Sequence, residues 1–127
     1  MLIKIFTDAA TQGNPGPSAA GIIIVVAGQQ IQLKSKLGQA NNHAAEFQAA
    51  IWGFQQLARY AHADDTIMFY TDSRIVADAV GKQYAKNFSD SFQELTRLID
   101  RYHMVLTEWI PDKQNRGAHN LALQALH

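Results

Sequence analysis

The sequence contains no cysteine, so a disulfide framework and a metal site built on thiolates are both excluded. It also lacks a long hydrophobic run, because the longest, Ile22–Ala27, is far shorter than the about 20 apolar residues of a membrane-spanning helix. The apolar start, Met1–Phe6, has no small-residue cleavage site and an acid, Asp8, follows it closely, unlike a signal peptide. From these absences we expect a cytoplasmic protein that does not contact a membrane.

The chain also has no net charge, because 11 Lys and Arg residues balance 11 Asp and Glu residues. Bulk positive charge therefore does not drive binding to a nucleic acid, and any such binding needs a local cationic face. Hydrophobic residues make up 47% of the chain and charged residues 17%, which argues against disorder. A chain of 127 residues can hold its own core but is too short for two ordinary domains, so we expect a single domain over residues 1–127.

The first third of the chain predicts an antiparallel meander of three strands. Leu2–Phe6 and Ala20–Val26 are apolar runs rich in β-prone residues, and Ile31–Leu37 alternates apolar with polar residues. Between the first two runs, Gly13–Pro17 reads Gly-Asn-Pro-Gly-Pro, which is the strongest turn signal in the chain and closes a hairpin.

The rest of the chain predicts helices that alternate with strands. Apolar residues recur every three or four positions from Asn42 to about Ala61, which indicates an amphipathic helix. Further strands are expected at 66–71 and 104–110, and further helices at 72–80, 92–102 and 117–126, with Ser89 and Ser91 as capping candidates before the second of these helices. The expected order is βββαβααβα, an α/β fold with a five-stranded mixed sheet and helices on both faces.

Three acids stand where these expected elements meet loops. Asp8 ends the first strand, Asp72 ends the fourth, and Glu46 lies in the first turn of the first helix. A carboxylate at the end of an apolar strand is costly to bury unless something compensates it. If the first and fourth strands are neighbours, the three acids cluster, and clustered carboxylates stay ionised only when a divalent cation holds them. Oxygen ligands alone favour Mg²⁺ or Mn²⁺.

The segments around these acids resemble those of the type 1 ribonucleases H. Thr7-Asp8-Ala9-Ala10 followed by Gly13–Pro17 is similar to the opening of that family, in which a strand-ending Asp precedes a Gly-Asn-Pro-Gly-Pro hairpin. Asn41–Phe47 resembles the family's N-N-x-x-E segment, and Tyr70–Ser73 resembles its strand-end T-D-S. The segments follow one another with family-like separations, the order of elements is the family's, and the resemblance covers essentially the whole chain.

The resemblance implies an endonuclease that hydrolyses the RNA strand of an RNA–DNA hybrid and leaves 5′-phosphate and 3′-hydroxyl ends. It implies two Mg²⁺ or Mn²⁺ ions in the site, with Asp8 bridging both and with Glu46 and Asp72 as further ligands. No nucleophilic side chain is needed, because the ions supply most of the charge stabilisation. The implied partner is the hybrid itself, and no obligate protein partner is expected, so we expect a monomer.

The resemblance also implies which side chains bind the hybrid: Asn14, Asn41, Asn42, His43 and Arg74. Asn amides can sense 2′-hydroxyls in the minor groove and so distinguish RNA from DNA. The family usually has a second Asn at position 43 and an amide at position 74, and Arg74 instead favours a phosphate or an acidic neighbour. Asn41 stands where the family often has Thr, near the phosphate of the DNA strand.

The family's fourth acid is missing from this chain. Trp109–Ala122 resembles a W-I-P-x-x-x-N-x-x-A-D-x-L-A segment in which His119 occupies the Asp position, and a shift of one residue places Asn120 there. Leu121 and Ala122 match without a shift, which favours His119 as the fourth catalytic and metal-binding residue. A neutral imidazole can ligate an ion or shuttle a proton near neutral pH, although hard cations prefer oxygen.

Two other functions are consistent with parts of the sequence. A catalytically weak or silent nucleic-acid-binding domain would have lost turnover with the fourth acid, but the other three carboxylates argue against it. A 3′–5′ exonuclease needs Asp-x-Glu on the first strand, whereas Asp8 is followed by Ala9 and Ala10.

Overall fold

A five-stranded mixed sheet organises the protein, and the computed structural model describes all 127 residues. The strands are β1 Leu2–Thr11, β2 Gly16–Val26, β3 Gln29–Ala40, β4 Thr66–Thr71 and β5 Met104–Trp109. In the sheet they lie in the order β3-β2-β1-β4-β5. β1, β2 and β3 pair antiparallel, and β4 and β5 continue the sheet in parallel on the other side of β1. The expected meander and the expected mixed sheet are confirmed.

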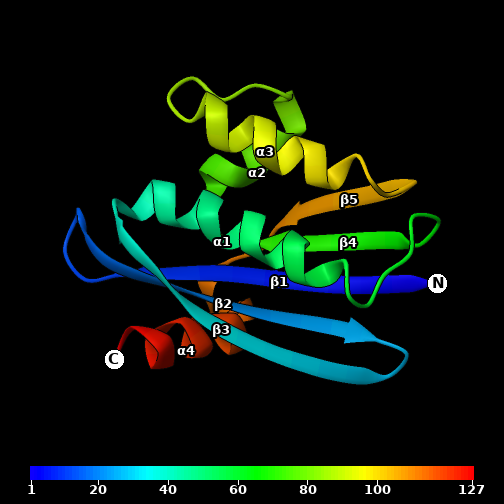
Figure 1. The fold of residues 1–127 in the computed structure, drawn as a ribbon, viewed down its shortest axis with the longest axis horizontal. Coiled ribbons are helices and arrows are strands. Elements are labelled where there is room, and N and C mark those ends of the chain that lie inside the picture. The colour runs from blue at the N-terminus through cyan, green and yellow to red at the C-terminus, as the bar shows by residue number, and fades with distance from the viewer.

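Helices lie on both faces of this sheet, as predicted. They are α1 Asn42–Leu57, α2 Arg74–Lys82, α3 Ser89–Ile99 and α4 Arg116–Leu126, with a 3₁₀ helix, η1, at Asp112–Gln114. α1 packs on β1 and β2, α3 packs on α1, and α4 covers β1, β2 and β3 from the opposite face (Figure 1). None of these helices has both the length and the hydrophobicity required to span a bilayer.

The core lies between the sheet and α1. Ile3, Ile5 and Ile22 are fully buried there, and Phe47 and Phe54 of α1 fill the space above them. Because helices cover both faces of β2, this strand is apolar without alternation along most of its length.

One glycine allows α4 to lie directly on the sheet. Gly21 faces α4, and a Cβ at this position would overlap the carbonyl oxygen of Ala118. Glycine has no Cβ, so it permits this close approach of strand and helix. The approach places the first turns of α4 beside β1, where Asp8 lies.

Two acids lie elsewhere in their elements than the sequence predicted. β1 continues to Thr11 because its antiparallel pairing with β2 outlasts its parallel pairing with β4, so Asp8 lies within the strand and not at its end. α1 begins at Asn42, which puts Glu46 in the second turn and not the first. Helix-dipole stabilisation in the first turn therefore does not account for Glu46.

Several helix ends also differ from the prediction. α1 ends at Leu57, and α2 continues past Gly81 to a left-handed Gln83. α3 begins after Phe88 with no side-chain cap, so Ser89 and Ser91 do not serve as caps. Helix ends are weakly encoded because only a few local hydrogen bonds decide them.

Candidate active site

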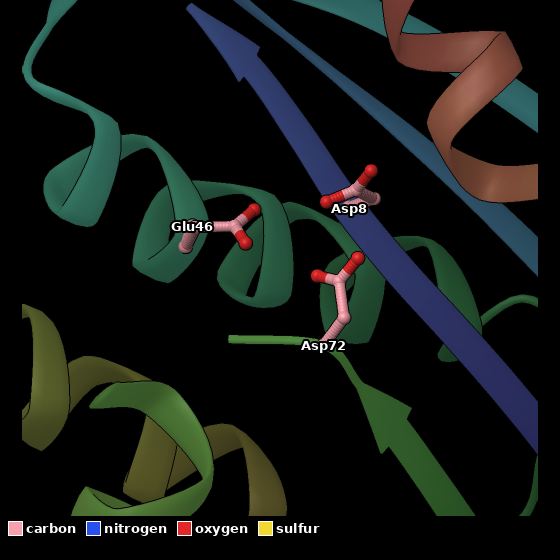
Figure 2. A group of neighbouring side chains, drawn as sticks. All are labelled: Asp8, Glu46 and Asp72. Carbon is pink, nitrogen blue, oxygen red and sulfur yellow. The ribbon is translucent and has the colours of Figure 1, made fainter. Parts of the chain in front are cut away.

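Three carboxylates converge at one edge of the sheet. β1 and β4 run parallel, and their last paired residues are Thr7 and Thr71, so Asp8 and Asp72 follow side by side. α1 crosses this edge and brings Glu46 above them. One carboxylate oxygen of each acid lies within 4.8 Å of the others, and Figure 2 shows the three side chains turned toward a common space. The predicted cluster is confirmed.

The pKa values of all three carboxyls are raised. Asp8 is only 4% exposed, and its burial raises the pKa of its carboxyl. Burial raises the pKa of Glu46 well above its ordinary value, and the negative charges of Asp8 and Asp72 raise it further. Burial and the charge of Asp8 together raise the pKa of Asp72 to about 7. A divalent cation would remove this cost, and a donor set made of carboxylate oxygens fits Mg²⁺ or Mn²⁺.

His119 is the fourth side chain at the cluster. Its Nδ1 lies 2.8 Å from Oδ2 of Asp8, and 49% of the side chain is exposed. An ionised Asp8 accepts only, so Nδ1–H donates, and in the neutral ring Nε2 keeps a free lone pair. His119 lines the cavity over the carboxylates and Asn120 does not, so the structure favours the alignment that places His119 at the family's Asp position.

A buried amide sets the position of His119. Asn115 is 2% exposed, and its Nδ2 donates to the carbonyl oxygen of Thr7 over 2.9 Å. The backbone N–H of His119 in turn donates to the carbonyl of Asn115 over 3.1 Å. The start of α4 is thereby tied to the residue that precedes Asp8.

A cavity of about 390 Å³ opens on one side of the cluster. Its lining includes four of the predicted substrate-binding residues: Asn14, Asn42, His43 and Arg74. Oδ1 of Asn14 accepts the backbone N–H of Asn42 over 3.1 Å, which ties the β1–β2 hairpin to the start of α1. Asn41 is not part of this lining. Its Oδ1 caps α1 by accepting the N–H of Ala44 over 2.7 Å. The predicted contact of this side chain with the substrate therefore competes with its role as a helix cap.

Trp109 holds Arg74 beside the cluster. The guanidinium carbon of Arg74 lies 3.9 Å from the centroid of the Trp109 ring, in a cation–π contact. Nε1–H of the same ring donates to the carbonyl oxygen of Asp72 over 3.0 Å. The sequence alone does not predict this role, because nothing in the order of elements shows that the end of β5 faces the start of α2.

A second cavity, of about 500 Å³, opens on the other side of the cluster. It is lined by Asp8, Glu46, Asp72 and His119, together with Asp112, Lys113 and Arg116. The last three residues were not predicted as site residues, although they lie within the Trp109–Ala122 segment that pointed to His119. They lie on or next to η1, a short helix without the hydrophobic periodicity that predicts longer ones.

Fold, site and sequence agree on one family, since a model of the RNase H family matches residues 2–125. The chain belongs to the RNase H family. The Enterococcus faecalis protein named "Putative hydrolase EbsB" is 36% identical over 98% of this chain and 94% of its own length. The Ribonuclease H of Trichodesmium erythraeum is 37% identical over 68% of this chain and 52% of its own length. This RNase H family member thus has relatives named as enzymes.

Solved structures share the fold of this RNase H family member. RNase H1 from Halobacterium salinarum NRC-1 superimposes with a TM-score of 0.91 at 24% identity, over 99% of this chain and 98% of the other. LC11-RNase H1, solved in complex with an RNA/DNA hybrid, has a TM-score of 0.89 at 23% identity, over 98% and 96% of the two chains. At these identities the likeness establishes the fold.

Proposed function

We propose that this protein is a divalent-metal-dependent endonuclease that hydrolyses the RNA strand of RNA–DNA hybrids, leaving 5′-phosphate and 3′-hydroxyl ends. The observation that carries the proposal is the convergence of Asp8, Glu46 and Asp72 within 4.8 Å, in a chain of the RNase H family. The chain acts as a single domain and as a monomer, without an obligate protein partner.

Asp8, Glu46, Asp72 and His119 are the residues that hold the metal. Two Mg²⁺ or Mn²⁺ ions held there would supply an activated water and would stabilise charge on the leaving 3′ oxygen. Asp8 is the central ligand, because it is the most buried acid of the cluster and touches His119. His119 holds a proton on Nδ1 against Asp8, which leaves Nε2 to bind an ion or to exchange a proton with solvent.

The amide-lined cavity binds the hybrid. Oδ1 of Asn14 is already engaged with the N–H of Asn42, so its Nδ2 donors are available to a 2′-hydroxyl. Arg74 presents a planar fork of donors that suits a phosphate, and its stacking on Trp109 lowers the cost of ordering it. The binding of a hybrid by LC11-RNase H1, which shares this fold, supports the same substrate here.

A cleavage assay tests this function. The purified protein is incubated with a short labelled RNA–DNA hybrid in Mg²⁺ or Mn²⁺, with duplex DNA and duplex RNA as controls. We expect internal cuts in the RNA strand of the hybrid alone, without base preference and with a need for several consecutive ribonucleotides. A product ladder that grows from one terminus would point to an exonuclease instead.

The histidine at position 119 favours a second candidate function, a catalytically silent domain that binds hybrids. A fourth carboxylate would hold a hard cation more strongly than an imidazole does. Hybrid binding without cleavage in either metal would establish this alternative.

A further inference from the structure

The two cavities adjoin at the carboxylate cluster. Ala9, Glu46 and Asp72 line both of them, so the cavities meet at the cluster. The first cavity carries the amides of Asn14 and Asn42 together with Arg74, and the second carries Lys113 and Arg116 but no side-chain amide. A strand that crosses the cluster therefore meets different chemistry on its two sides.

Lys113 and Arg116 are the cations that line the second cavity. Both are exposed, and neither forms a salt bridge, although Asp8, Asp72 and Asp112 line the same cavity. Their charges are thus available to a ligand.

Both cations stand on an anchored stretch of backbone. Lys113 lies in η1 and Arg116 begins α4, so they flank Asn115, whose buried amide is bonded to Thr7. The N–H of Asn115 also donates to the carbonyl of Asp112 over 2.9 Å. A fixed backbone limits the conformational entropy that is lost when the two side chains bind.

The lining of this cavity suits phosphate better than a base. Ala9 is its only hydrophobic lining residue, and no Phe, Tyr or Trp ring lines it. The His119 imidazole, its one aromatic ring, is hydrogen-bonded to Asp8 at the cluster. The acids of the cavity repel a nucleic acid strand, and the chain has no net positive charge to offset them. Local cations are therefore required where the backbone of the strand leaves the cluster.

We propose that Lys113 and Arg116 form a subsite for phosphate groups of the RNA strand, on the side of the scissile phosphate opposite to Asn14 and Asn42. This proposal rests on the proposed function and deepens it. The RNA strand crosses the cluster from the amide-lined cavity, where its 2′-hydroxyls are sensed, to the cavity where Lys113 and Arg116 neutralise its phosphates.

Equilibrium binding tests the subsite apart from catalysis. The affinity of Asp72→Asn protein for an RNA–DNA hybrid is measured in Mg²⁺ over a series of salt concentrations, with and without Lys113→Gln and Arg116→Gln. Each lost phosphate contact lowers the slope of log K against log salt by about 1, so we expect the pair of substitutions to lower it by about 2. Lys4→Gln with Arg59→Gln makes the same charge change at exposed positions outside both cavities and should leave the slope unchanged.

A chemical double-mutant cycle locates the subsite on the strand. The hybrid carries a short ribonucleotide stretch that fixes the cut, and a neutral methylphosphonate replaces one phosphate on either side of it. On one side only, the neutral linkage should remove most of the effect of the Lys113→Gln and Arg116→Gln pair.

The outcomes separate this proposal from the proposed function. Hybrid binding with a slope equal to that of the Lys4→Gln and Arg59→Gln control overturns the subsite alone. Additive effects on both sides of the cut overturn it as well, because the cations would then act through bulk charge. If the parent protein binds no hybrid, the proposed function and the subsite fail together.

Discussion

Nδ1 of His119 lies 2.8 Å from Oδ2 of Asp8, the most buried acid of the cluster. By the resemblance to the type 1 ribonucleases H, this imidazole stands where that family has a fourth carboxylate. A neutral imidazole adds a ligand without adding negative charge, so the site attracts a hard dication less than four carboxylates would. Metal preference is therefore the property in which this protein should differ from relatives with the fourth acid.

We expect cleavage to be faster in Mn²⁺ than in Mg²⁺ at low metal concentration, and His119→Asp to lower the Mg²⁺ concentration that gives half-maximal rate. His119→Ala should slow cleavage by about 10- to 100-fold, at or below the low end of general acid–base effects, because the three acids remain. The measurement is the cleavage rate against metal concentration for each variant. Asn120→Asp is the register control, and a shift of the metal curve with Asn120→Asp but not with His119→Asp would contradict the assignment of His119.

Asp8→Asn and Asp72→Asn should each abolish cleavage and leave the metal-free protein as stable as the wild type or more stable. Each substitution removes one of three mutually repelling carboxylates, whose pKa values are raised in the folded state. Thermal unfolding in EDTA together with the cleavage assay checks both parts. Asp78→Asn, on the exposed face of α2, is the control and should change neither property. A cleaving Asp8→Asn variant would refute the metal site.

The stability of the metal-free protein should fall as the pH rises from about 4 to about 7. Asp72 has a folded-state pKa of about 7 against an ordinary value of 3.8, so in this range the folded state binds a proton that the unfolded state has released. The stabilisation by that proton is complete below pH 3.8 and is lost as the pH passes the folded pKa. Denaturant unfolding at several pH values checks this, and Asp72→Asn or saturating Mg²⁺ should flatten the profile. A wild-type profile already flat in EDTA would be inconsistent with the raised pKa.

Trp109→Phe should weaken hybrid binding through Arg74. The phenyl ring retains part of the cation–π contact but loses the Nε1–H donor to the carbonyl of Asp72, a hydrogen bond worth about 1 kcal/mol. Arg74→Gln should weaken binding more and lower its salt dependence, because a phosphate contact is lost. Binding isotherms at two salt concentrations check both variants. Trp52→Phe is the control, since Trp52 lies on α1 and lines neither cavity.

Asn115→Ala should destabilise the protein by about 1–3 kcal/mol, because it leaves the buried carbonyl of Thr7 without its donor. It should also slow cleavage beyond any loss of folded protein, since the start of α4 loses its tie to β1. Urea unfolding and the rate per folded molecule separate the two effects. Asn120→Ala, at an exposed position of the same helix, should leave both measurements unchanged.

The order of elements and three of the site acids follow from the chain alone. Hydrophobic periodicity depends on which face of an element is buried, so it predicts strands and helices before their partners are known. Asp8 and Asp72 are recognisable because each interrupts or ends an apolar run, and Glu46 because it stands in a segment that resembles N-N-x-x-E, with His43 in place of the second Asn. Parallel pairing of β1 with β4 then brings the acids together, since parallel strands have their carboxyl ends at the same edge.

The tertiary structure decided what depends on contacts between distant segments. The position of His119 at the carboxylate cluster follows from the packing of α4 on Gly21 and from the amide of Asn115, and the local sequence gives no sign of either contact. Exposed cations such as Lys113 produce no hydrophobic pattern, so only the folded structure shows that they line the same cavity as the carboxylates. The sequence by itself determined which elements form and which acids are candidate site residues, because hydrophobic periodicity and an acid in an apolar run can both be read from the order of residues. The fold decided their neighbours, because packing and hydrogen bonding join residues that are far apart in the chain.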